Sequence, residues 1–261
     1  MNLDLRGKRA LVCGSTQGIG KAAAIELALL GASVTLLARN QSELERVRGE
    51  LSVLFHQQHE ILVADFNDPV GLKRTVTDYV TDHPVQVLVN NTGGPPSGPI
   101  TEASTEAFLQ AFNNHLVCNQ LLAQAVLPGM KKAGYGRIIN IISTSVKQPL
   151  KNLGVSNTVR AAVANWSKTW SGEVAAYGIT VNNVLPGATD TVRLRSLIEA
   201  KAQKTGHAVE KVRQEMLEEV PMGRFADASE IANAVAFLAS PAAGYITGIN
   251  VPVDGGRTSS L

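Results

Sequence analysis

Three glycines near the start of the chain, Gly14, Gly18 and Gly20, have a spacing that suits the binding of phosphate groups. They follow the apolar run 9–13 and open the amphipathic stretch 18–30. Glycine lacks a Cβ, so the turn can be tight and the backbone can approach a pyrophosphate closely. The N–H groups and the positive dipole end of the following helix would then face the phosphates. Because it lies between a strand and a helix, this turn predicts a nucleotide site rather than a purely structural turn. The turn also contains the candidate cofactor-binding residues Ser15, Gln17 and Ile19.

The second apolar run, 33–38, is followed by Arg39, with no acidic residue before Glu43. In dinucleotide-binding folds, an acidic residue at this place binds the ribose hydroxyls of NAD, whereas a nearby arginine accommodates the 2′-phosphate of NADP. A guanidinium can donate two parallel hydrogen bonds to a phosphate. The sequence therefore predicts NADP(H) as the cofactor. The alternative interpretation is a solvated arginine that opens a loop.

Short apolar runs alternate with longer helical patterns along the whole chain, and these elements must position the residues above. Strands are predicted at 9–13, 33–38, 60–64, 85–90, 137–142, 179–185 and 249–253, and helices at 18–30, 41–51, 69–82, 104–132, 155–176 and 227–239. Most of the strand runs are apolar throughout, which is typical of strands buried on both faces of a parallel sheet. The alternation predicts an α/β fold with a doubly wound parallel sheet of about seven strands, in a single Rossmann domain over 1–261. Ligands of such sheets bind beyond the carboxyl ends of the strands.

The order of the motifs resembles the short-chain dehydrogenase/reductase family, in particular its 3-oxoacyl-carrier-protein reductase-like members, over nearly the whole chain. The glycine turn is one family motif, and "NNTGG" (90–94) is similar to the family's Asn-Asn-Ala-Gly, with Thr92 in the place of alanine. "LPGATDT" (185–191) resembles its Pro-Gly motif, and "PMGRFADASEIANAVAFLAS" and "YITGINVPVDGG" resemble its C-terminal region.

The resemblance implies cofactor contacts at eight further positions. They are Asp65 and Phe66 at the adenine, Asn91 and Gly93 along the ribose, Pro186 and Gly187 over the nicotinamide, and Thr189 and Thr191 at its amide or the phosphates. Two of these residues have a plain alternative role, because Asp65 could cap a turn and Thr191 could cap the helix that follows it.

The tyrosine and lysine that the family uses for proton transfer are replaced in this chain. The family has a serine after the fifth strand, a tyrosine, a lysine four residues later and an asparagine on an earlier helix. Ser143 matches the serine, but Ser156 stands in the place of the tyrosine and Arg160 in the place of the lysine. No tyrosine of the chain is followed four residues later by lysine. His115 falls at the asparagine position, and a shift of one residue would place Asn114 there.

These replacements change the available chemistry. A serine hydroxyl is a far weaker acid than a phenol, whose pKa is about 10. Arginine stays charged, so Arg160 could hold a ribose or stabilise an oxyanion but could not exchange a proton. His115 could act as a general acid, or it could be a structural side chain.

The resulting expectation is an NADP(H)-dependent oxidoreductase that acts on a carbonyl/alcohol pair in a small or acyl-carried substrate. Ser143 would polarise the oxygen, Arg160 would hold the cofactor, and His115 or a water held by Ser156 would supply the proton. The first alternative is a catalytically silent NADP-binding or regulatory protein of the same fold. The second is a lyase- or isomerase-type reaction with NADP as a structural ligand.

Composition and charge limit the classes of binding partner that the chain could have. The formal net charge is +2 and 18% of the residues are charged, which gives no electrostatic footprint for nucleic acid or a membrane surface. No run approaches the ~18 uninterrupted apolar residues of a spanning helix. Cys13 and Cys118 match no metal spacing, so we expect no metal site and a reducing cytoplasm.

The insertion 190–221 is predicted to be a helical lid over the substrate, as in the family. Its charged residues at helical spacing suit a solvated face, while the early Arg193 and Arg195 favour an anionic substrate. The resemblance also implies a homo-oligomer, expected to be a tetramer, in which the predicted helices 104–132 and 155–176 could supply shared faces.

Overall fold

The computed structural model describes residues 1–260, and these form a seven-stranded parallel sheet. The strands lie in the order β3–β2–β1–β4–β5–β6–β7. Their bounds are β1 Arg9–Cys13, β2 Ser33–Ala38, β3 Glu60–Val63, β4 Val87–Asn90, β5 Gly136–Ile141, β6 Ile179–Pro186 and β7 Asn250–Val253. The predicted doubly wound sheet is confirmed, and each predicted strand is present with its ends shifted by at most two residues.

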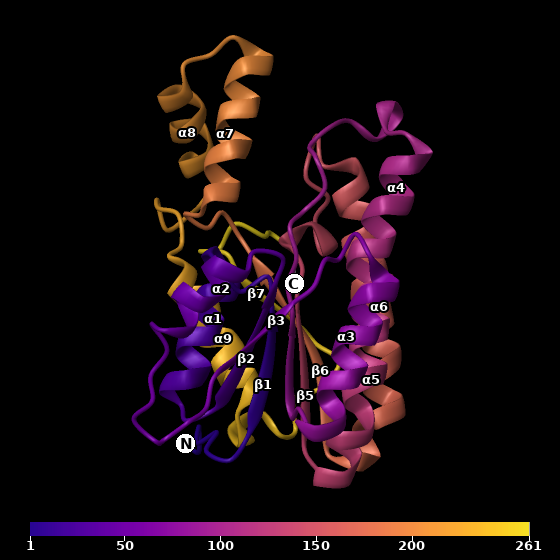
Figure 1. The fold of residues 1–261 in the computed structure, drawn as a ribbon. Coiled ribbons are helices and arrows are strands. Elements are labelled where there is room, and N and C mark those ends of the chain that lie inside the picture. The colour runs from indigo at the N-terminus through magenta and orange to yellow at the C-terminus, as the bar shows by residue number, and fades with distance from the viewer. Residues whose placement is uncertain (261) are drawn as a thin grey trace.

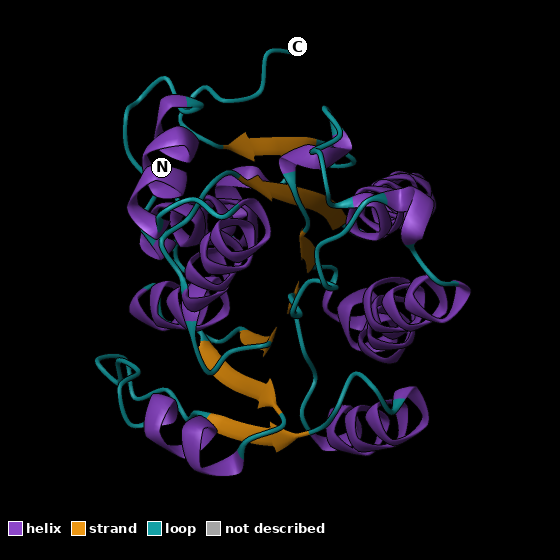
Figure 2. Cartoon of the chain, turned by 90° about the horizontal axis from the view of Figure 1, so that it is seen from above, coloured by secondary structure: helices purple, strands orange, loops and turns teal. Residues whose placement is uncertain are grey.

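Helices cover both faces of the sheet (Figures 1 and 2). One face packs against α1 (Gly18–Leu29), α2 (Gln41–Arg48) and α9 (Ala228–Ala239). The other packs against α3 (Pro69–Asp82), α5 (Cys118–Ala133) and α6 (Gly154–Val174). In β1, Ala10 and Val12 enter the first core while Leu11 and Cys13 enter the second. A strand with a core on each side must be apolar at every position, which is why these runs do not alternate in polarity.

A row of asparagine side chains crosses the interior of the sheet. Asn90, Asn140, Asn183 and Asn250 are register partners on β4, β5, β6 and β7. The amide Nδ2 of each of the first three donates to the Oδ1 of the next side chain in the row, over 2.8–2.9 Å. The inner atoms of the row therefore pair with one another without water, and among its buried polar atoms in residues 1–260 only Asn90 Oδ1 has no partner.

The long helix predicted over 104–132 is interrupted, so that prediction was wrong in detail. The chain forms α4 (Thr105–Phe112), then a π-helical turn at Asn113–Val117, then α5. The π-helical turn contains more residues per turn than the 3.6 of an α-helix, so the side chains that follow it point in a different direction from the one that a 3.6-residue period predicts. Such turns are frequent at functional sites.

The insertion 190–221 forms two helices, α7 (Val192–Thr205) and α8 (Val209–Glu218), which stand above the sheet in Figure 1. They pack on each other through Leu194, Ile198, Ala202 and Val212. Because this small cluster is separate from the two main cores, the pair is anchored to the domain chiefly at its ends. No helix within residues 1–260 is long and apolar enough to cross a lipid bilayer.

Candidate functional site

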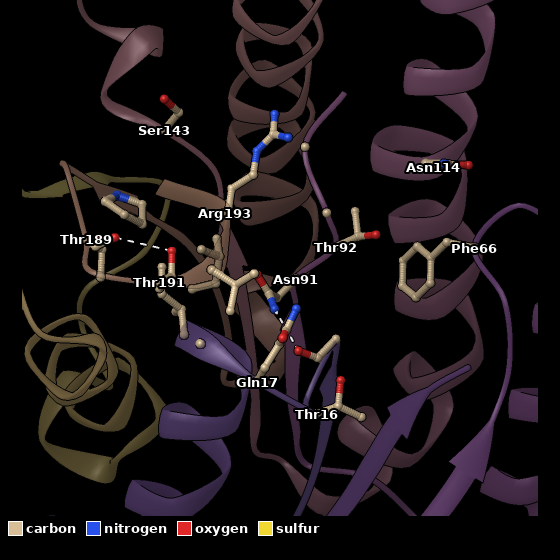
Figure 3. Close-up of a pocket in the computed structure, with 18 of the residues that line it drawn as sticks. Thr16, Gln17, Phe66, Asn91, Thr92, Asn114, Ser143, Thr189, Thr191 and Arg193 are labelled. Carbon is tan, nitrogen blue, oxygen red and sulfur yellow. Dashed lines mark hydrogen bonds between the residues drawn. The ribbon is translucent and has the colours of Figure 1, made fainter. Parts of the chain in front are cut away.

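A cavity of about 720 Å³ lies where the strands end, and Figure 3 shows its interior. Its wall comes from the segments that follow β1, β2, β3, β4, β5 and β6, together with α6 and α7. This is the edge of a parallel sheet at which ligands are expected. A second cavity, of about 960 Å³, adjoins it under α7, and Ser143 lines both.

The glycine turn has the geometry of a phosphate cradle. Gly14 and Gly18 adopt positive φ angles of 58° and 55°, and both line the cavity. A Cβ on Gly14 would lie 2.7 Å from the backbone oxygen of Asn91. The α1 N-terminus carries no side-chain cap hydrogen bond and no acidic residue in its first turn. Its N–H groups and positive dipole end therefore remain available for an anion.

The turn residues do not all face the cavity. Gln17 and Ile19 line it, as does Thr16, which the motif did not single out. Ser15 is fully buried and its hydroxyl donates to the Leu37 carbonyl at 3.4 Å. Gly20 lies behind the turn, where a Cβ would approach the Gly14 oxygen to 2.2 Å. Ser15 and Gly20 therefore support the cradle from behind.

The residues expected at the adenine end lie together. Arg39 and Asp65 both line the cavity, with Arg39 Nη1 4.0 Å from Asp65 Oδ2. Phe66 also lines it and is nearly buried against the second core. Figure 3 shows Asn114 beside Phe66, and Asn114 Nδ2 donates to Asn67 Oδ1 at 2.9 Å.

Asn91 and Gly93 lie in the segment after β4 and line the middle of the cavity. Asn91 Nδ2 donates to the carbonyls of Cys13 and Gly14, at 3.3 and 3.2 Å. The Asn91 side chain thus fixes the glycine turn.

The segment after β6 closes another side of the cavity. Pro186, Gly187, Thr189 and Thr191 all line it. Thr191 Oγ1 accepts from the N–H of Leu194 at 3.4 Å, so Thr191 is both the cap of α7 and a cavity residue. A Cβ on Gly18 would lie 3.3 Å from the Thr191 methyl group. Helix α7, which was expected to be a lid, therefore begins in contact with the glycine turn.

Ser143, Ser156 and Arg160 come together in the cavity wall. Ser143 Oγ accepts from the N–H of Ser145 at 3.1 Å, which orients the hydroxyl. Ser156 is half-buried on the first turn of α6, and Arg160 follows one turn later. Arg160 is 8% exposed, and its Nη1 donates to the Ile141 carbonyl at 2.7 Å. Burial, and then the charge of Arg193, lower the pKa of Arg160 to about 10, so Arg160 remains a cation at neutral pH.

His115 is buried behind the cavity rather than in its wall. Burial, followed by the charge of Arg160, lowers the pKa of His115 to about 2, against a hydrogen bond with the Gly93 backbone that acts in the opposite direction. A histidine that is neutral at all ordinary pH values does not serve as an imidazolium acid. Asn114, one residue earlier, reaches the cavity instead, because the π-helical turn falls at this point. The geometry therefore disfavours His115 as the proton donor.

Within residues 1–260, no group of three or more His, Cys, Asp or Glu side chains is placed to hold a metal ion. Both cysteines are buried thiols.

Comparison with known proteins agrees with this arrangement. The family described as "Enoyl-(Acyl carrier protein) reductase" matches residues 14–258. The chain is 36% identical to the 3-oxoacyl-(acyl-carrier-protein) reductase FabG of Pseudomonas aeruginosa, over 99% of this chain and 100% of that protein. It is 31% identical to the NADPH-dependent reductase BacG of Bacillus subtilis, over 97% of this chain and 99% of that protein.

Among solved structures, the L-sorbose reductase of Gluconobacter frateurii, complexed with NADPH and L-sorbose, superposes with a TM-score of 0.93 at 31% identity and covers 100% of both chains. Fold, motif order and full-length identity thus agree. This chain belongs to the short-chain dehydrogenase/reductase family.

Proposed function

We propose that this protein is an NADP(H)-dependent oxidoreductase that acts on a carbonyl/alcohol pair in a small or acyl-carried substrate. The observation that carries the proposal is the placing of Ser143, Ser156 and Arg160 in the same cavity as the glycine turn and Arg39. The relatives add support, because FabG is named for a 3-oxoacyl substrate and BacG for NADPH.

The residues present fit an NADP cofactor. The glycine turn leaves space that a Cβ on Gly14 would fill, and the α1 N-terminus lacks its own cap. Arg39 points its guanidinium into an exposed position at the end of β2, with only one carboxylate, Asp65, as near as 4.0 Å. A dianionic 2′-phosphate would find a cation there. Thr189 and Thr191 would hold the nicotinamide end.

The chain's own residues supply the polar part of the reaction. The bound nicotinamide would supply or accept the hydride. Ser143 would donate its hydroxyl proton as a hydrogen bond to the substrate oxygen, since its Oγ already accepts from a backbone N–H. The Arg160 cation would stabilise negative charge that develops on that oxygen, in a wall where burial makes the interaction strong. Ser156 would hold the water that delivers the proton.

A catalytically silent NADP-binding protein is the second candidate. One observation favours it: the chain has no tyrosine followed four residues later by lysine, and the histidine nearest to Arg160 is buried behind the cavity. In this case the glycine turn and Arg39 would bind the cofactor, and the cavity would perform no hydride transfer.

Binding and turnover of NADPH, measured side by side, separate the two candidates. NADPH affinity is measured by calorimetry, and oxidation of NADPH is followed with a 3-oxoacyl thioester, a ketose, a cyclic diketone and the oxo acids acetoacetate and 2-oxobutyrate. We expect both binding and turnover. Gly14→Ala should abolish both, because its Cβ would meet Asn91. Gly134→Ala is the matched control, since Gly134 also has a positive φ, of 57°, but has no neighbour within 4 Å of an added Cβ. Tight binding without turnover on every substrate would instead establish the silent protein.

A further inference from the structure

Two arginines from different elements converge on one glycine of the cavity wall. A Cβ built on Gly94 would lie 3.5 Å from Arg193 Nη2 and 3.9 Å from Arg160 Nη2. Arg160 comes from α6 and Arg193 from the first turn of α7. Arg193 Nη2 donates to the Pro95 carbonyl at 2.6 Å, which ties the lid to the segment after β4. Figure 3 shows the Arg193 side chain reaching between Ser143 and Thr92.

No carboxylate neutralises this pair of charges. Neither Arg160 nor Arg193 takes part in an ion pair among residues 1–260, and the single acidic residue that lines the cavity, Asp65, lies beside Arg39. Arg160 Nε is buried and has no hydrogen-bond partner in the described chain. A guanidinium has five N–H donors, so both side chains retain donors for a ligand. The buried Arg160 cation has no anionic partner, which is unfavourable, and this indicates that an anion completes the site.

The adjoining cavity under α7 is also lined by more positive than negative side chains. Lys151, Lys201, Lys204 and Arg257 line it, with one carboxylate, Glu219, which itself pairs with Arg257. Lys201 pairs with Glu215, 3.4 Å away. A cavity whose charged lining residues are mostly cations attracts anions. Because Ser143 lines both cavities, an anion drawn into this region would arrive next to the hydroxyl group that we place at the reacting oxygen.

We propose that the substrate carries a carboxylate close to its reacting carbonyl, and that Arg193 and Arg160 hold this carboxylate beside Ser143. This inference rests on the proposed function, since it names the substrate class of the same cavity. The anion could instead be a phosphate group of the cofactor. The cofactor phosphates, however, already have the glycine turn and Arg39. Arg160 lies one helical turn after Ser156 on α6, and its Nη1 donates to the carbonyl of Ile141, two residues before Ser143.

The test measures equilibrium binding to the protein saturated with NADP⁺, so that the phosphate positions of the cofactor are filled. The probes are acetoacetate, 2-oxobutyrate and benzoate, each compared with its neutral methyl ester by calorimetry. Each carboxylate should bind about ten- to a hundredfold more tightly than its ester. Arg193→Gln should remove most of this preference, and Arg193→Lys, which keeps the charge but not the planar donors, should retain part of it.

Arg195→Gln is the matched control. Arg195 lies on the same helix, pairs with the exposed Asp190 at 3.3 Å and lines neither cavity, so its loss should leave the preference intact. Three results would overturn the proposal: equal binding of carboxylates and esters, a preference that survives Arg193→Gln, or tighter binding of inorganic phosphate than of any carboxylate. If Arg193→Gln weakens NADPH binding as much as carboxylate binding, Arg193 serves the cofactor and the proposal also fails. Because these readouts need no turnover, a carboxylate preference without hydride transfer would refute the proposed function, while the role of the two arginines in binding a carboxylate would stand.

Discussion

Replacement of Arg39 by alanine should lower the affinity for NADPH and leave the affinity for NADH nearly unchanged. Arg39 lies at the end of β2 in the cavity wall, where the 2′-phosphate of NADP would lie. Its side chain is 70% exposed and makes one distant ion pair, 4.0 Å from Asp65. NADH lacks the 2′-phosphate, so the two cofactors differ at the group that Arg39 would contact.

The size of the effect follows from that exposure. A hydrogen bond to a charged group contributes about 1.5–3 kcal/mol. Solvent screens a largely exposed guanidinium, so the lower end of the range applies, about 1.5 kcal/mol. This corresponds to a roughly tenfold loss of NADPH affinity. Asp65→Asn should act in the opposite direction, because it removes a negative charge near the phosphate while keeping the Oδ1 that accepts from the Asn67 N–H.

Both cofactors are titrated by calorimetry against the parent protein and the variants. Arg48→Ala is the control, since Arg48 is exposed on α2 and lies outside the cavity wall. The tenfold loss should shrink as salt is added, because an exposed charge pair is screened. If Arg39→Ala weakens NADPH and NADH equally, or weakens neither, Arg39 does not select the cofactor and the reasoning is refuted.

Four further predictions follow from the site and the sheet. The paired change Ser156→Tyr with Arg160→Lys should raise carbonyl turnover by about 10²–10⁴-fold with little change in NADPH affinity, and either change alone should do less. Ser143→Ala in the paired variant should abolish the gain. A double variant that folds and binds NADPH but does not turn over would contradict this prediction. In the parent protein, kcat/KM should not change between about pH 6 and pH 9. The reason is that the pKa of His115 is lowered to about 2 and that of Arg160 only to about 10, so neither group titrates in this range. A bell-shaped profile in this range would mean that another residue donates the proton. Asn140→Leu should lower the free energy of unfolding in urea by about 2–6 kcal/mol, since it leaves one polar atom unpaired on each neighbouring strand, and a loss below about 1 kcal/mol would show that water replaces the amide. Light scattering at micromolar concentration should give the mass of a tetramer, and a monomeric mass would remove that expectation.

The sheet and the cradle were predictable because their signals are local. A fully apolar run such as 9–13 admits few interpretations when a glycine turn and a helix follow it, and the structure places β1, Gly14 and Gly18 as expected. The ends of the strands were less certain, since hydrogen bonding to a neighbour decides them. For the same reason β4 begins at Val87, where its pairing with β1 begins, rather than at residue 85.

Other features depend on tertiary structure. The choice between Asn114 and His115 could not be made from a 3.6-residue period, because the π-helical turn at Asn113–Val117 alters the direction of both side chains. Ser15 belongs to the glycine motif, but its hydroxyl bonds to the neighbouring strand β2. The convergence of Arg160 and Arg193 joins residues that are far apart in the sequence, and no spacing rule reveals it.

The asparagine row has a direction. Its three hydrogen bonds all run toward β7, so the dipoles of the side chains add along the row and polarise one another. One amide cannot rotate alone without placing two oxygens or two N–H groups face to face, and reversal therefore requires all four to turn together. A leucine at one of the inner positions would therefore leave a polar atom unpaired on each neighbouring strand. Asn91 directly follows Asn90, the first member of the row, and its side chain donates to the carbonyls of Cys13 and Gly14. A substitution in the row that shifts Asn90 would therefore also shift a contact that holds the glycine turn.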